Sequence, residues 1–127
     1  MTRFITSRLR SFRHAFHGWW YVICTQQNAW IHAIVSIVVI LLALWLSLPL
    51  RDWAVLILTI AMVWSAEFFN TAIEAVVDLA SPDRHPLAKV GKDVGAAAVL
   101  IAALASVLVG ISLFGPPLLE QLLRWLM

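Results

Sequence analysis

The sequence AIVSIVVILLALWLSL, residues 33–48, contains no charged side chain. Together with its neighbours it gives a segment, residues 29–50, that is long enough to cross a hydrocarbon layer about 30 Å thick as a helix. Two further segments, residues 53–80 and 94–114, are also predominantly apolar. We therefore expect an all-α membrane protein with three membrane-spanning helices, over about residues 29–50, 53–80 and 94–114.

The composition of the whole chain supports this fold class. Hydrophobic residues make up 62% of the 127 residues and charged residues 13%, whereas a soluble domain has about 25% charged residues. A small soluble domain buries only about two-thirds of the surface of its unfolded chain, which is too little to hide so many apolar side chains. The composition excludes an ordinary soluble domain, and the length predicts one integral membrane domain over residues 1–127.

The N-terminal segment, residues 3–27, combines basic and aromatic residues. Its apolar residues recur every three or four positions, which is typical of a helix, and four arginines lie between them. A basic amphipathic helix of this kind lies in the headgroup plane of a bilayer. We therefore expect a surface helix, and we interpret the net charge of +2 as contact with the membrane rather than with nucleic acid.

The positions of lysine and arginine predict the orientation of the chain. Four arginines precede the first span, and one arginine and two lysines lie between the second and third spans. Only Arg51 and Arg124 lie on the other side. Because short loops rich in lysine and arginine stay in the cytoplasm, we expect the N-terminus and residues 81–93 on the cytoplasmic side of the membrane.

Local sequence signals predict where the spans end. Residues 49–52, which contain a proline and two charged residues, are expected to form a polar turn, and residues 81–83 are expected to end the second helix. The sequence Gly-Pro-Pro at residues 115–117 is expected to break the third helix before a short amphipathic end, residues 118–127.

Small residues recur along the third span, mostly every four positions. They are Gly91, Gly95, Ala98, Ala102, Ser106 and Gly110. Small residues on one stripe let helix backbones approach closely in lipid. Alanine is also common in apolar helices, but six small residues on one stripe favour a packed helix interface.

Four polar side chains of the second span, Glu67, Asn70, Glu74 and Asp78, are three or four residues apart. On a helix this spacing places them on one narrow face. Glu67 lies about 21 Å along the helix from Trp53. It is therefore expected inside the hydrocarbon layer toward the cytoplasmic side, with Glu74 and Asp78 at or beyond the boundary.

The carboxylates on this face indicate function. A carboxylate inside the hydrocarbon layer, such as Glu67, costs about 2.5–3.5 kcal/mol on insertion scales. Interhelical hydrogen bonding could explain Asn70 alone, but not three carboxylates. We interpret Glu67 as a general base. Glu74, at the water boundary, is better placed to bind Mg²⁺, which takes one or two carboxylates together with phosphate oxygens and water.

Charged residues after the second span complete the predicted site. Lys92, at the start of the third helix, can bind a phosphate as a point charge, and the N-terminus of that helix adds a favourable dipole. His85, Lys89 and Asp93 lie nearby, although these residues also fit a simple cytoplasmic loop. No glycine-rich nucleotide-binding motif occurs. Three spans are too few to enclose a site, so a neighbouring subunit is expected to complete it.

Two other classes of protein are considered. A proton-coupled transporter subunit also uses a carboxylate inside the membrane. In such a protein, however, we would expect the carboxylate near the middle of the bilayer, without lysines beside it. A passive assembly subunit could use the small-residue stripe, but it leaves Glu67 unexplained. The acidic face that reaches Lys92 and Asp93 favours a phosphate-handling enzyme over both.

The segment EFFNTAIEAVVD, residues 67–78, resembles the motif ExxNxxxExxxD of the prokaryotic diacylglycerol kinase family. HPLAK at residues 85–89 and, less specifically, NAWIH at residues 28–32 also match. The resemblance covers about residues 12–114. It implies a homotrimeric kinase of the bacterial inner membrane that transfers the γ-phosphate of MgATP to diacylglycerol or undecaprenol. The segments 28–32 and 85–89 are somewhat more similar to the undecaprenol kinase branch.

The same resemblance implies roles for single residues. Glu67 matches the proposed base, and Glu74 matches the residue that binds the metal bridging the ATP phosphates. Gln26 stands where the family often has a second metal-binding glutamate, and its carbonyl oxygen can coordinate Mg²⁺ without adding charge. Other positions match residues that line the site or contact the nucleotide: Asn70, Asp78, Asp83, Arg84, His85, Lys92 and Asp93.

Overall fold

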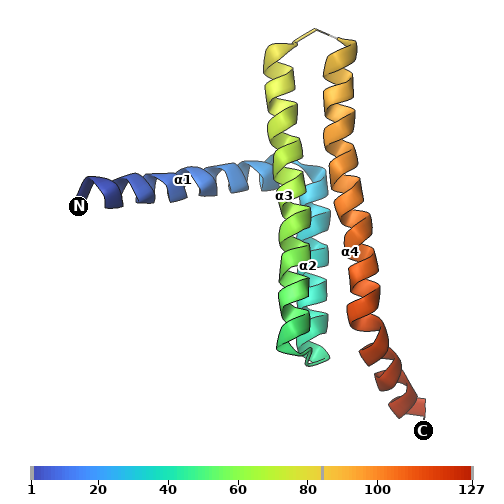
Figure 1. Cartoon of the computed structure of the whole chain (residues 1–127). Coiled ribbons are helices and arrows are strands. Elements are labelled where there is room, and N and C mark those ends of the chain that lie inside the picture. Colours follow the sequence, from blue (N-terminus) through green and yellow to red (C-terminus); the bar gives the residue numbers. More distant parts are fainter. Residues whose placement is uncertain (1, 84, 127) are drawn as a thin grey trace.

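The computed structural model describes residues 2–83 and 85–126 and contains four helices there (Figure 1). They are α1 (Thr2–Thr25), α2 (Gln27–Trp45), α3 (Leu50–Ala80) and α4 (Pro86–Leu126). By length and composition, α2, α3 and α4 are apolar enough to cross a membrane. The expected all-helical fold with three membrane-spanning helices is confirmed at this level.

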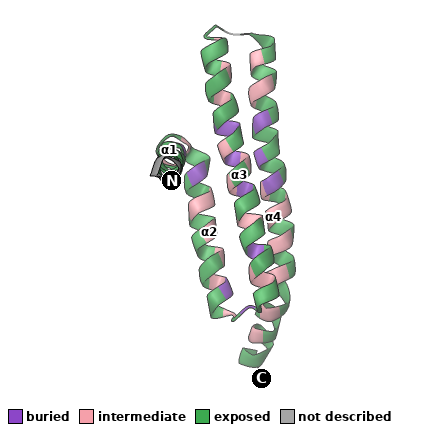
Figure 2. Cartoon of the chain, turned by 60° about the vertical axis from the view of Figure 1, so that its left-hand side comes forward, coloured by how far each residue is buried: buried purple, intermediate pink, exposed green. Residues whose placement is uncertain are grey.

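The helices α3 and α4 form a long side-by-side pair joined by a short turn, and α2 lies beside the half of this pair that is remote from the turn (Figure 1). Helix α1 leaves the bundle crosswise at the start of α2. Buried residues lie where the helices face one another, and most of the remaining surface is exposed (Figure 2). Because much of this exposed surface is apolar, it suits contact with lipid.

Helix α1 is attached to the bundle through aromatic side chains. Its Trp19 stacks on Trp64 of α3, with ring centroids 6.3 Å apart and an interplanar angle of 29°. At the junction with α2, Gln26 has an extended backbone, with φ −101° and ψ 119°. One non-helical residue is therefore enough to turn the chain from α1 into α2.

The connection between α2 and α3 lies earlier in the chain than the sequence predicts. Helix α2 ends at Trp45, and Ser47 has a left-handed backbone with φ 53°. The Leu48 amide donates to the Ala43 carbonyl at 3.1 Å, which closes the helix end. Arg51 and Asp52 lie in the first turn of α3 and not in a polar turn, so that expectation is wrong.

The structure also corrects two expectations about the third span. Helix α4 starts at Pro86 and continues through Pro116 and Pro117 to Leu126, so Gly-Pro-Pro does not end it. Two prolines remove only two backbone donors, and the axis of α4 changes direction toward its C-terminal end (Figure 1). On the stripe of small residues, Ala98 is exposed whereas Gly95 is buried, so within one chain α4 packs through only part of the stripe.

Candidate functional site

The centre of the candidate site is Glu67 of α3, which is fully buried. Neither of its carboxylate oxygens has a hydrogen-bond partner among the described residues. The nearest polar partner is on α2, where His32 Nε2 lies 3.8 Å from Glu67 Oε2. Since helix pairing brings the two residues together from different segments, the contact depends on the tertiary fold.

The next turn of α3 carries Asn70 and Glu74. The Asn70 amide nitrogen donates to Glu74 Oε1 at 3.1 Å, and the other end of the amide faces α4. A Cβ atom at Gly95 would lie 2.5 Å from Asn70 Oδ1, which is far inside an ordinary contact distance. Glycine at position 95 therefore allows α4 to pass close to the Asn70 side chain.

Asn70 and Glu74 line a pocket of about 280 Å³ formed by the start of α2, by α3 and by α4. Gln26, His32, Asn70 and Glu74 supply its polar wall. Among the described residues, no group of three or more His, Cys, Asp or Glu side chains is arranged to hold a metal ion. Glu74 and Gln26 nevertheless share this pocket, and one carboxylate with an amide oxygen fits the sparse protein coordination of Mg²⁺.

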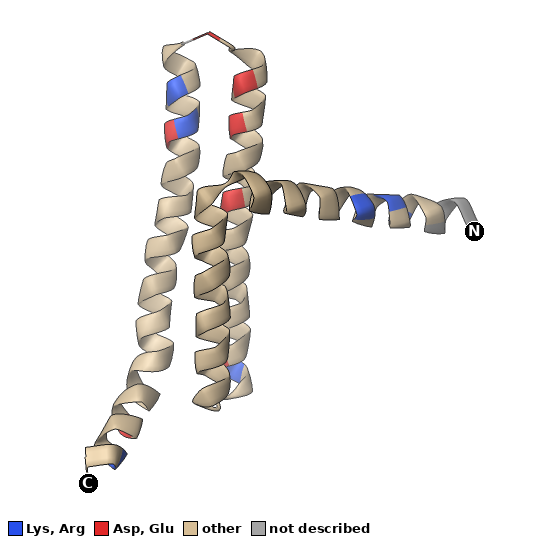
Figure 3. Ribbon diagram, turned by 180° about the vertical axis from the view of Figure 1, so that it is seen from behind, with Lys and Arg blue, Asp and Glu red and all other residues tan. Residues whose placement is uncertain are grey.

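A second pocket, of about 620 Å³, lies at the turn between α3 and α4. Asp78, Asp83, His85, Lys92 and Asp93 line it together with another lysine, Lys89. Figure 3 shows the acidic residues in succession along α3 and the lysines on α4 at the same end. The sequence therefore brings acidic and basic groups from both helices to one end of the pair.

Two ion pairs organise this second pocket. Lys92 Nζ on α4 lies 2.5 Å from Asp78 Oδ1 on α3, and Lys89 Nζ lies 2.7 Å from Asp93 Oδ2 one turn further along α4. His85 Nδ1 accepts a hydrogen bond from the Leu87 amide at 3.2 Å and so caps the start of α4. Arg84, which the resemblance assigns to the nucleotide, lies outside the described residues.

The two pockets are neighbours along α3. Glu74 lines the first pocket and Asp78 lines the second. The two residues are one helical turn apart, which corresponds to about 6 Å along the axis. Asn70, Glu74 and Asp78 therefore line neighbouring pockets along one side of α3, and Glu67 lies buried one turn before Asn70.

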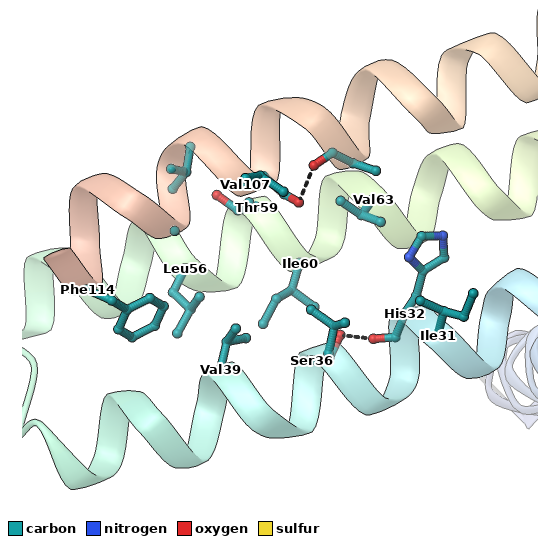
Figure 4. Close-up of a pocket in the computed structure, with 15 residues that line it drawn as sticks. Ile31, His32, Ser36, Val39, Leu56, Thr59, Ile60, Val63, Val107 and Phe114 are labelled. Carbon is teal, nitrogen blue, oxygen red and sulfur yellow. Dashed lines mark hydrogen bonds between the residues drawn. The ribbon is translucent and has the colours of Figure 1, made fainter. Parts of the chain in front are cut away.

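A third, apolar groove of about 320 Å³ runs between α2, α3 and α4 (Figure 4). Its walls include Val39, Leu56, Ile60 and Phe114, and it ends at His32. The groove shares His32 with the polar pocket that contains Glu74. An elongated apolar molecule with one polar end would fit an apolar groove that leads to a polar pocket in this way.

Sequence reasoning missed two residues of the site. His32 was noticed only within a weak motif, because nothing in the local sequence reports that it contacts Glu67 on another helix. Lys89 was named beside the predicted phosphate site but was given no role of its own, although its position one turn before Asp93 is the spacing of a helical ion pair. That spacing could have identified it.

Comparisons with known proteins agree with the geometry. A sequence model of the prokaryotic diacylglycerol kinase family matches residues 13–114. The chain is 47% identical over 113 residues to a diacylglycerol kinase of Synechocystis sp., covering 88% of this chain and 65% of that relative. It is 38% identical over 109 residues to the undecaprenol kinase of Bacillus subtilis, covering 86% and 89%. For a diacylglycerol kinase of Escherichia coli K12, the identity is 34% over 89 residues, covering 65% and 73%.

Proposed function

Because the chain belongs to the prokaryotic diacylglycerol kinase family, whose relatives named above are lipid kinases, we propose that it phosphorylates a membrane lipid. The reaction moves the γ-phosphate of ATP onto a lipid hydroxyl at the cytoplasmic leaflet and gives the lipid phosphate and ADP. The observation that carries this proposal is the fully buried carboxylate of Glu67, which has no hydrogen-bond partner among the described residues and lies 3.8 Å from His32, a residue that lines both the apolar groove and the polar pocket.

In this reaction Glu67 is the general base. It accepts the proton of the lipid hydroxyl while the bond between the hydroxyl oxygen and the γ-phosphorus forms. The bond between that phosphorus and ADP breaks on the opposite side, and its electrons leave with ADP. Phosphoryl transfer depends mainly on positioning and electrostatics, so a base without competing hydrogen bonds is suited to receive this proton.

The nucleotide is proposed to bind across the turn between α3 and α4. Lys92 supplies a positive charge for the phosphates, and Asp78 holds the lysine until they arrive. Asp83, His85 and Asp93 line the remaining wall. The family resemblance also assigns Arg84, which lies outside the described residues, to nucleotide binding.

Mg²⁺ is proposed as the cofactor, held by Glu74 and by the side-chain oxygen of Gln26. When bound, it would neutralise charge on the β- and γ-phosphates. Asn70 orients Glu74 through the hydrogen bond between its amide nitrogen and Glu74 Oε1. The shared pocket of these three residues supports this assignment.

The lipid acceptor is proposed to be undecaprenol or diacylglycerol, the substrates that give the relatives their names. Its hydrocarbon tail would lie in the groove between α2, α3 and α4, whose walls are almost entirely apolar. Its hydroxyl would reach the end of the groove at His32. Both lipids satisfy this chemistry, so the acceptor is decided by assay.

The assembly is proposed to be a homotrimer in the bacterial inner membrane. Most apolar side chains of α2, α3 and α4 are exposed in a single chain, and the pocket around Glu74 is open at one side. Neighbouring subunits would complete the sites. The N-terminus and the turn after α3 would face the cytoplasm, with α1 lying on the membrane surface as predicted from its basic and aromatic residues.

The experiment is a transfer assay with radiolabelled ATP and the purified protein in lipid micelles. Undecaprenol and dioleoylglycerol are supplied side by side, and label is counted in the extracted lipid. We expect label in at least one lipid, dependent on Mg²⁺. The absence of label in both, with the folded protein, would overturn the proposed function and would favour the transporter class.

A further inference from the structure

The kinase chemistry described above gives Glu67 a role but leaves His32 without one. His32 Nε2 lies 3.8 Å from Glu67 Oε2, which is longer than the roughly 2.7–3.2 Å of a hydrogen bond. His32 Nε2 and both carboxylate oxygens of Glu67 are buried and have no partner among the described residues. A buried polar atom without a partner costs about 1–3 kcal/mol, so these atoms point to a polar ligand atom that pairs with them.

The distance of 3.8 Å between the two atoms allows one oxygen atom to bond to both. An oxygen about 2.8 Å from both His32 Nε2 and Glu67 Oε2 would form a hydrogen bond with each. A hydroxyl is suited to this position, because it can donate its proton to the carboxylate and accept a hydrogen bond from the imidazole N–H. A phosphate or carboxylate is not suited, because it would place an acceptor against Glu67.

The surroundings indicate that this hydroxyl belongs to a lipid. The apolar groove and the polar pocket share Ile31, His32 and Ala103 as lining residues. His32 therefore stands where a hydrocarbon chain in the groove would end and the polar pocket begins. Figure 4 shows its imidazole extending from α2 into the space between the helices.

The imidazole is also held in place by its neighbours. The Trp64 ring lies edge-on to it, with ring centroids 6.3 Å apart. Trp64 Nε1 donates to Ser36 Oγ at 3.2 Å, and Ser36 Oγ donates to the His32 carbonyl at 2.6 Å. These hydrogen bonds hold the Trp64 indole, which in turn packs edge-on against the imidazole, as expected for a preorganised site.

On the basis of the lipid kinase function, we propose that His32 is a second catalytic residue that binds the acceptor hydroxyl. Its Nε2–H donates to the hydroxyl oxygen and turns the hydroxyl proton toward Glu67 Oε2. During transfer this proton moves to Glu67, the new oxygen–phosphorus bond forms, and the bond to ADP breaks with its electrons on ADP. His32 keeps its own proton throughout.

The test compares His32→Leu with His32→Gln, whose side-chain nitrogen reaches about as far as Nε2. We expect His32→Leu to lower kcat about 100-fold, as for removal of other donors to a reacting oxygen, with KM for ATP unchanged. His32→Gln should recover most of this loss. His14→Leu on α1, an exposed histidine, is the matched control and should behave as wild type.

A double variant separates direct from indirect effects. If both residues act on the same hydroxyl, Glu67→Gln combined with His32→Leu should lose no more activity than Glu67→Gln alone. Fully additive losses would contradict the shared contact. Wild-type activity of His32→Leu, or equal inactivity of folded His32→Gln and His32→Leu, would overturn the role of His32 as a donor.

A measurement on the wild-type protein needs no variant. The histidine ring nitrogens are observed by NMR in micelles while a short-chain prenol is added, and the hydrocarbon of the same length without the hydroxyl is the control. We expect the His32 Nε2 signal to shift with the prenol only. Equal responses to both would overturn the proposal. A wild type without lipid kinase activity would instead overturn the proposed function, so the two failures are distinguishable.

Discussion

Gly95→Ala tests the close contact between α3 and α4 on which the polar pocket depends. The added Cβ would lie 2.5 Å from Asn70 Oδ1, whereas an ordinary contact begins at 3.4 Å. The Asn70 amide or the α4 backbone must therefore move by about 0.9 Å, the difference between these two distances. Asn70 is buried and its amide nitrogen is bonded to Glu74, so neither movement is free.

The expected loss follows from these contacts. Overpacking of this kind costs about 1–3 kcal/mol, and rotation of the Asn70 amide would also break its hydrogen bond to Glu74. If Glu74 binds the metal, losing the partner that orients it should lower kcat/KM by about 10–100-fold. The assay combines unfolding by SDS in mixed micelles with lipid phosphorylation at saturating and limiting Mg²⁺.

Gly18→Ala, on α1, is the matched control, because no atom lies within 4 Å of a Cβ atom added there and Gly18 lines none of the three pockets. Alanine is about 1 kcal/mol better than glycine in a helix interior, so this variant should be as stable as wild type or slightly more stable, with unchanged activity. If Gly95→Ala instead behaves like Gly18→Ala in both assays, the close approach of α4 to Asn70 is wrong.

Two further predictions concern the ends of the helices. Ser47→Gly should stabilise the protein by about 1 kcal/mol, because Ser47 has a left-handed backbone that a non-glycine residue adopts at this cost. The control, Ser65→Gly within α3, should destabilise the protein by about 0.5–1 kcal/mol. Equal stability of the two variants in SDS unfolding would contradict the turn geometry. Lys92→Gln should raise KM for ATP about tenfold while changing stability by less than about 1 kcal/mol, since the ion pair of Lys92 with Asp78 is largely exposed. Arg124→Gln, at the other end of α4, is the control in the kinetic assay. An unchanged KM for ATP in Lys92→Gln would show that Lys92 does not bind the nucleotide.

The parts of the fold that depend on local pattern could be predicted from the sequence. The three apolar segments predict three helices able to cross a membrane, and the three-to-four spacing of Glu67, Asn70, Glu74 and Asp78 places them on one face of α3. The hydrogen bond from Asn70 to Glu74 and the pair between Asp78 and Lys92 agree with this placement. The hydrogen bond depends on helix periodicity, which the sequence carries directly, whereas the ion pair also needs α4 to pack beside α3.

The parts that depend on contacts between helices could not be predicted. His32 meets Glu67 only because α2 packs against α3, and no spacing within either helix reports that contact. Similarly, Ala98 fits the small-residue pattern but is exposed, because only the packing of α4 on α3 decides which side of the stripe is buried. The prediction that Pro116 and Pro117 end the helix is wrong, because α4 continues past both. Helix-breaking signals describe the average free-energy cost of proline within a helix and do not decide a single case.

The most direct test of the account is lipid phosphorylation by Glu67→Gln, measured together with its affinity for MgATP. Glutamine keeps the size of the side chain but cannot accept the hydroxyl proton as a carboxylate does. Glu120→Gln, at an exposed position near the end of α4, controls for the loss of one negative charge. We expect Glu67→Gln to bind MgATP as wild type does but to transfer no phosphate to lipid, whereas Glu120→Gln should be fully active. Near-normal lipid phosphorylation by folded Glu67→Gln would contradict the role of Glu67 as the general base.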